Sequence, residues 1–257
     1  MSQQLVGKNL GLVFAVKNHS LSILNPDFLK YSGIVPQDWN LARQPIYTNS
    51  AVQVVFTNGI SIIAEPNRVI FMEPIDDKTM SELNIAEIAR KYVQTLPNIE
   101  YEAVGINPRG YVSFAGSPDA ARKYMAENLL SPGAWQSAGD SPMRASLNLV
   151  YKFQRAPFYL SITEAALRNE DETSTPIVMF SGSFSYELSG ENGAEKISHL
   201  HNCLENWQTD LNTYSDLINQ KFLQKIPSSL LAASDESTVS VPATVPDLFT
   251  MSAATIA

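Results

Sequence analysis

The densest group of side chains that can bind metals lies near the C-terminal end of the sequence. His199, His201 and Cys203 fall close together in a segment with helical periodicity. Residues four apart share a helix face, so His199 and Cys203 point one way and His201 points elsewhere. A metal site needs three or four convergent ligands, and the nearest carboxylate, Glu205, is better placed to pair with His201. We therefore expect solvated or core-edge helix residues here, with no metal or other cofactor.

Ser183 is the serine whose neighbours come nearest to a nucleophile motif. The segment Gly182–Tyr186 has one glycine of a nucleophile elbow, but it lacks the second and lies in an antiparallel strand pattern. The glycine-containing segment Gly105–Gly110 has no lysine and no following helix N-terminus, so it predicts a turn and not a phosphate-binding loop. The sequence thus predicts no catalytic residue.

Acidic residues gather in segments expected to be loops. Asp76-Asp77 and Glu170-Asp171-Glu172 are better explained as solvated charges than as paired catalytic carboxylates. Cross-strand ion pairing accounts for Glu65, Arg68 and Glu73. These residues therefore indicate no acid–base chemistry.

The composition excludes several classes of protein. Of 257 residues, 44% are apolar and 17% charged, which is typical of a soluble globular chain, and no apolar run reaches the roughly 18 residues that span a bilayer. The first residues lack a signal-peptide pattern, and a single cysteine forms no intrachain disulfide, so we expect a cytoplasmic protein. A net charge of −8 without Lys/Arg clusters argues against nucleic-acid and anionic-membrane binding.

The segment from Ala51 to Leu96 predicts three strands followed by a helix. Asn58-Gly59 lies between apolar, β-branched runs, which indicates a hairpin in which both turn residues accept positive φ. Pro66-Asn67 predicts a second tight turn. The helix Met80–Leu96 follows, with Thr79 and Glu82 placed to form a capping box.

Further elements surround this unit. Leu10–Val16 is a candidate strand, and a long connection over residues 20–50 carries aromatic side chains that we expect to anchor it on the core: Phe28, Tyr31, Trp39 and Tyr47. Ile99–Ile106 predicts another strand, broken by a turn at 107–110, after which Tyr111–Phe114 continues the strand or pairs with it. A helix is expected from Ser117 to Leu130.

A similar order follows a Ser-, Gly-, Pro- and Ala-rich stretch over residues 131–144. Strands are expected near 147–153, 158–162 and 178–187; in the last of these Ser181, Ser183 and Ser185 alternate with apolar residues and present a hydroxyl-rich face. A single long helix is expected over 194–226. Its heptad-like apolar seam is Ile197, Leu200, Leu204, Trp207, Leu211, Tyr214 and Ile218.

The last residues have a different composition. Residues 228–257 contain no Lys or Arg and are rich in Ser, Thr, Ala, Val and Pro, which predicts a mostly disordered tail. Leu248 and Phe249 form an apolar island in it that can dock on a partner as a short peptide, or remain inert.

The order of strands, the strand Tyr101–Asn107 after the first helix, and the segment Leu204–Phe222 carry a resemblance. Over roughly residues 10–226 the sequence resembles an uncharacterised, sporadically distributed family of bacterial hypothetical proteins, including ones of photosynthetic bacteria. The resemblance implies an α+β arrangement of sheet-and-helix halves and no chemistry.

Together these patterns predict an α+β protein of two related β-β-β-α halves, in which antiparallel sheets, separate or continuous, are each backed by a helix. The halves are residues 1–130 and 145–227, joined by a linker at 131–144 and followed by the tail at 228–257.

We expect a non-enzymatic interaction or assembly protein that binds a protein partner or itself. Its partner-binding residues would be Trp207, Tyr214, Ile218, Leu248 and Phe249, together with the serine-rich sheet face. The alternative is a small-molecule-binding protein or enzyme with a pocket between helix and sheet, lined by Tyr92, Tyr101, Trp207 and Tyr214.

Overall fold

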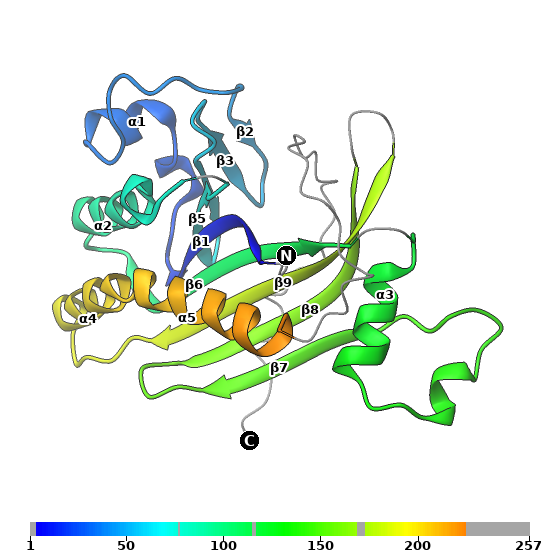
Figure 1. The fold of residues 1–257 in the computed structure, drawn as a ribbon. Coiled ribbons are helices and arrows are strands. Elements are labelled where there is room, and N and C mark those ends of the chain that lie inside the picture. Colours follow the sequence, from blue (N-terminus) through cyan, green and yellow to red (C-terminus); the bar gives the residue numbers. More distant parts are fainter. Residues whose placement is uncertain (1–3, 77, 115–116, 169–172, 225–257) are drawn as a thin grey trace.

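A single antiparallel sheet of nine strands organises the structure (Figure 1). The computed structural model describes residues 4–76, 78–114, 117–168 and 173–224. Within these ranges the strand order is β2-β3-β4-β5-β1-β6-β9-β8-β7. The strands are β1 (Val6–Lys17), β2 (Ile46–Tyr47), β3 (Val52–Val55), β4 (Ser61–Glu65), β5 (Arg68–Pro74), β6 (Glu100–Ser113), β7 (Ser146–Lys152), β8 (Pro157–Arg168) and β9 (Ser174–Glu187).

Strands β1, β6 and β9 join the two parts of the chain at the centre of this sheet. β6 pairs with β1 along one side and with β9 along the other, so strands from both predicted halves share one hydrogen-bonded ladder. The prediction of an α+β fold is therefore confirmed, and the sheet is continuous across the two parts.

Strand β6 is longer than the sequence predicted. A turn at 107–110 was expected to break it, but β6 runs continuously from Glu100 to Ser113, so that prediction was wrong. Proline has no N–H to donate to a ladder. Pro108 is accommodated because the regular pairing between β6 and β9 is interrupted between Ile106 and Arg109.

Both predicted hairpins are present, but the first uses a different turn. Gly59 has a φ of +84°, whereas Asn58 is not among the residues with positive φ. The Gly59 N–H donates to the Phe56 carbonyl and the Phe56 N–H to the Ile60 carbonyl, which gives a three-residue loop with glycine in the left-handed position. Only glycine needed the unusual conformation. Pro66-Asn67 joins β4 and β5 as expected.

The helices that contact the sheet lie on one of its faces. Cross-strand pairs place Phe71, Leu12, Ile106, Phe184 and Phe158 in one row. Tyr92 of α2 (Ile85–Thr95) packs on Phe71 at one end of this row, and Tyr214 of α5 (Trp207–Leu217) packs on Phe158 at the other. We call this the covered face and the opposite one the open face.

The helical segments are η1 (Leu21–Ile23), α1 (Pro26–Tyr31), η2 (Met80–Glu82), α2 (Ile85–Thr95), α3 (Ala120–Tyr124), η3 (Met125–Leu129), η4 (Ala134–Ser137), α4 (Gly193–Glu205), α5 (Trp207–Leu217) and η5 (Ile218–Phe222). No helix in the described ranges has the length and apolar character needed to cross a membrane.

The long C-terminal helix is divided in two at Asn206, which caps both α4 and α5. The Asn206 side chain donates to the Asn202 carbonyl, a local bond that competes with regular helix geometry. The predicted apolar seam runs along both helices and faces the sheet: Leu200, Leu204, Leu211, Tyr214 and Ile218 are buried. Its apolar residues therefore belong to the core.

The connection over residues 20–50 packs down through aliphatic more than aromatic residues. Leu24, Leu29 and Ile34 are fully buried. Trp39 packs edge-on against Phe56 with ring centroids 5.3 Å apart, and Phe28 is partly buried against the core. Tyr31 and Tyr47 are exposed, so only two of the four predicted aromatic anchors contact the core.

Candidate functional site

The three potential metal ligands on α4 have separate environments. The His199 Nδ1 accepts a hydrogen bond from the Ser189 N–H at 3.0 Å. Burial lowers the pKa of His201, which lies beside Arg90, and burial raises the pKa of the Cys203 thiol to about 11. Within the described ranges no group of three or more His, Cys, Asp or Glu side chains can hold a metal ion.

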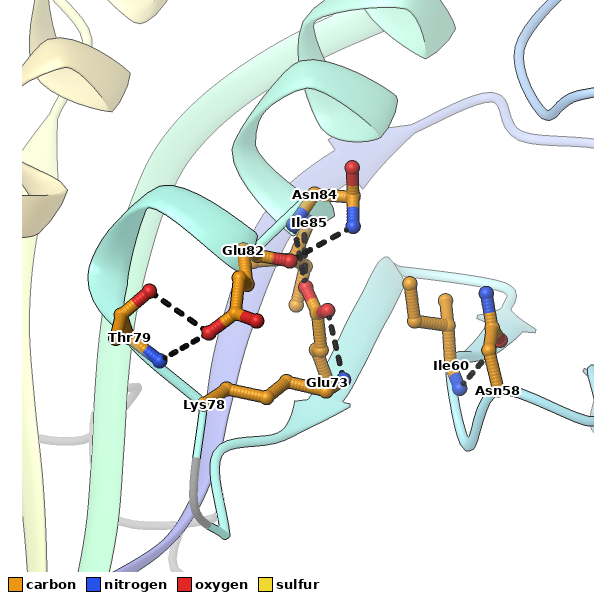
Figure 2. A network of polar contacts seen from close by, with 8 residues as sticks. All are labelled: Asn58, Ile60, Glu73, Lys78, Thr79, Glu82, Asn84 and Ile85. Carbon is orange, nitrogen blue, oxygen red and sulfur yellow. Dashed lines mark hydrogen bonds and ion pairs between the residues drawn. The ribbon is translucent and has the colours of Figure 1, made fainter.

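Glu73 is a buried carboxylate whose role is structural (Figure 2). One of its oxygens accepts hydrogen bonds from the backbone N–H groups of Asn84 and Ile85, each at 2.8 Å, and the other binds Lys78 Nζ at 3.1 Å. The first N–H groups of a helix have no partner within the helix. The Glu73 carboxylate, on β5, is the acceptor for the N–H groups at the start of α2.

The predicted capping interaction lies beside Glu73 in the same network. The Glu82 carboxylate accepts from both the N–H and the hydroxyl of Thr79 at 2.7 Å (Figure 2). It starts the short helix η2 and not α2, because Leu83 and Asn84 interrupt the helix that the sequence predicted as continuous.

Asp210 is a second buried carboxylate, which the sequence did not single out. It binds Arg155 Nε at 2.5 Å and accepts from the Tyr186 hydroxyl at 2.7 Å. Burial raises the pKa of Asp210, while its bonds to Tyr186 and Arg155 oppose that shift. The cluster ties the β7–β8 turn and β9 to α5, and its partners satisfy the carboxylate, so we assign it a structural role.

The predicted partner-binding residues have different positions. Tyr214 and Ile218 face the sheet with exposed fractions of 1% and 0%, so their side chains are not available at the surface. Trp207 is partly buried against the core and retains some exposure. Leu248 and Phe249 lie outside the described residues, as do the rest of the predicted tail and the acidic segment 170–172.

The tyrosines expected to line a pocket between helix and sheet fill the core. Tyr92 hydrogen-bonds His19, Tyr101 donates to the Leu96 carbonyl and Tyr214 donates to the Phe180 carbonyl. Tyr101 borders a surface pocket of about 300 Å³ beside the start of α4, and Tyr214 borders a different one of about 180 Å³ beside α5. These two pockets have no lining residue in common.

The open face of the sheet is polar at its centre. Ser181, Ser183 and Ser185 of β9 alternate with buried residues, as the sequence predicted. Cross-strand pairing extends this pattern into a row across four strands: Asn148, Ser161, Ser181 and Arg109. In the described part of the chain, the helices that contact the sheet pack against its other face.

Asn107 and Arg109 stand out on this open face. Both amide atoms of Asn107 are inaccessible to solvent and have no hydrogen-bond partner, although buried polar groups nearly always have one. Gly105 lies beside the Asn107 amide, where an added Cβ would stand 3.3 Å from both amide atoms and crowd them. Burial lowers the pKa of Arg109, whose guanidinium has no ion-pair partner among the described residues.

The sequence contained a signal for these two residues that the turn prediction obscured. Val104, Ile106, Val112 and Phe114 are apolar and fall an even number of positions apart, which is the period of a continuous strand through 107–110. Asn107 and Arg109 occupy the alternate positions of that strand. The period therefore places both on the face opposite the apolar residues, which is the open face beside the serines.

No protein-family model matches the sequence, and no curated protein matches it. The resemblance to bacterial hypothetical proteins stays a prediction.

Proposed function

We propose that this is a non-enzymatic protein-binding or assembly factor whose partner docks on the open face of the sheet. The observation that carries the proposal is Arg109, a partly buried cation that has no ion-pair partner among the described residues and lies opposite the half-buried Ser181 of β9. A carboxylate of a partner would give this guanidinium a charged acceptor.

Charge favours a partner segment that is rich in carboxylates. Arg109 is a partly buried cation without a carboxylate among the described residues, in a chain of net charge −8. The neighbouring serine hydroxyls add hydrogen-bond donors. An arginine that pairs a carboxylate bidentately gives strength and orientation together, so an acidic protein segment fits this surface best.

The outer side of the C-terminal helices is a weaker candidate for the partner surface. Most exposed residues of α4 and α5 are polar or charged: Glu195, Ser198, Asn202, Glu205, Gln208, Thr209, Asn212 and Asp216. Interface centres are depleted in charged residues and enriched in aromatic ones. Trp207, which is partly buried at the α4–α5 junction, remains a proposed partner-binding residue. The Leu248-Phe249 island remains a proposed partner-binding peptide, separate from the open face.

Site-specific photo-crosslinking tests the proposal. A photoreactive side chain at Ser183 on the open face should trap one protein in native lysate, with the crosslink in an Asp/Glu-rich segment. The same side chain at Gln208, on the outer side of α5, should not trap it. Equal trapping at both positions, or none at Ser183, would contradict the proposal.

Charge variants make the test specific. Arg109→Gln should lower the crosslink yield roughly tenfold, since a hydrogen bond to a charged group contributes about 1.5–3 kcal/mol. Lys91→Gln removes the same charge from α2, on the covered side, and should leave the yield unchanged. A crosslink yield that is the same with Arg109→Gln as with Lys91→Gln would show that the cation does not bind the partner.

The second candidate is small-molecule binding. Its supporting observation is the pocket of about 300 Å³ at the start of α4, lined by Tyr101 and by the polar residues Glu100, Asn192 and Lys196. Extra mass in a native mass spectrum that is lost with Tyr101→Leu would favour it.

The internal duplication into two helix-backed β-β-β-α halves is likewise a proposal.

A further inference from the structure

Strand β7 forms one edge of the sheet, and among the described residues no strand pairs with its outer side. Its seven residues are in unbroken register with β8, from Ser146 opposite Thr163 to Lys152 opposite Pro157. It contains no proline and no bulge. Natural edge strands are usually short, bulged, charged or covered.

The hydrogen-bond pattern identifies the residues whose backbone groups point outward. The Phe153 N–H donates to the Ala156 carbonyl at the end of the β7–β8 hairpin. Because bonded and non-bonded pairs alternate in an antiparallel ladder, Tyr151, Leu149 and Leu147 bond to β8. The backbone N–H and C=O groups of Ser146, Asn148, Val150 and Lys152 therefore face away from the sheet. None of these four makes another backbone bond to a described residue.

From this edge we infer that β7 pairs with β7 of a second copy of the chain, antiparallel, about a twofold axis at Leu149. That register overlaps all seven residues of both strands. It places Asn148 opposite Val150 of the other copy and Ser146 opposite Lys152, which are the residues with outward backbone groups. Every free donor and acceptor of the edge then has a partner.

The side chains of β7 are compatible with pairing to themselves. On the covered side, Leu149 meets its own copy and Leu147 meets Tyr151; all three are half-buried apolar side chains at the margin of the core. On the open side, Val150 is 60% exposed beside the 45% exposed Tyr159. No like charges face each other, since Lys152 lies opposite a serine.

The other edge of the sheet lacks these properties. β2 has only two residues and directly follows Pro45. A second copy thus finds one long edge and one short edge, and the long edge is self-complementary. Two copies paired through β7 form a closed dimer, because the twofold axis uses the edge once in each chain.

The test is the oligomeric state of the purified full-length chain, measured by sedimentation velocity over about 1–100 µM, the range in which a complex of micromolar Kd assembles. The expected result is a concentration-dependent dimer. Val150→Pro should give a folded monomer, because proline removes an outward N–H and no bond to β8, and Val150→Thr should still dimerise.

Charge variants keep the inference testable if the proline variant does not fold. Asn148→Lys with Val150→Lys puts two lysine pairs across the interface and should raise the dimer Kd at least tenfold. Asn148→Glu with Val150→Lys puts opposite charges there and should restore dimerisation. A monomeric wild type, or a dimer that none of these variants weakens, would overturn the inference. Because no other protein is present, the result is independent of the proposed acidic partner.

Discussion

Neighbouring residues of one strand point to opposite faces of the sheet, and the two faces differ in composition and packing. In β9, Phe184 is fully buried and stacks on Phe158 with ring centroids 4.3 Å apart, while the adjacent Ser183 lies on the open face. The covered face holds the apolar core that stabilises the fold. The open face carries small polar residues that add little to that core, and Ser181, Ser183 and Ser185 stay partly exposed on it.

The largest expected effect is the difference in the free energy of unfolding between a substitution at Phe184 and one at its neighbour Ser183. Phe184→Ala should lower the free energy of unfolding by about 3–5 kcal/mol, since it removes a buried ring and leaves a cavity. Ser183→Ala should change it by less than about 0.5 kcal/mol, as for substitutions away from the core. Urea denaturation of the two variants measures the difference. Similar losses would mean that the open face is packed like the covered one.

A smaller effect concerns the buried carboxylate under α2. Glu73→Ala should cost about 2–4 kcal/mol, because Asn84 and Ile85 lose their acceptor and Lys78 loses its partner. The exposed Glu82, which caps η2, is the matched control, and Glu82→Ala should cost much less. If chemical denaturation gave equal losses for the two variants, the cap from β5 would have no special role.

The smallest effect is a pH dependence on the covered side. Burial lowers the pKa of His19, whose Nε2 hydrogen-bonds the Tyr92 hydroxyl at 2.8 Å. The unfolded chain, with an ordinary histidine pKa near 6.5, then binds the proton more tightly, so stability is full above that pH and falls as the pH drops through it.

Denaturation midpoints measured between about pH 8 and 5.5 check this pH dependence, in the range where an ordinary histidine titrates. His19→Gln should flatten the fall. His201, whose pKa is also lowered, is present in both proteins and cancels in the comparison. A wild-type curve parallel to that of His19→Gln would contradict the assignment to His19.

Local patterns in the sequence determined much of the fold. The period-two alternation of Ser181–Ser185 gave the correct faces of β9, and Asn58-Gly59 and Pro66-Asn67 gave two hairpins, because turn and pleat preferences act over a few residues. The apolar seam through Leu200, Leu211 and Tyr214 is also real, although periodicity alone did not show that it faces the sheet and not a partner.

Only the tertiary structure decided which distant groups meet. Glu73 caps a helix that begins twelve residues later in the chain, and Asp210 binds Arg155 from another element. Asn107 and Arg109 lie on the open face because β1 and β9 pair with β6 on both sides and keep it extended through Pro108. Local preference favoured a turn there. Sheet pairing overrode it because the ladders on the two flanking strands add hydrogen bonds and buried area that no local pattern contains.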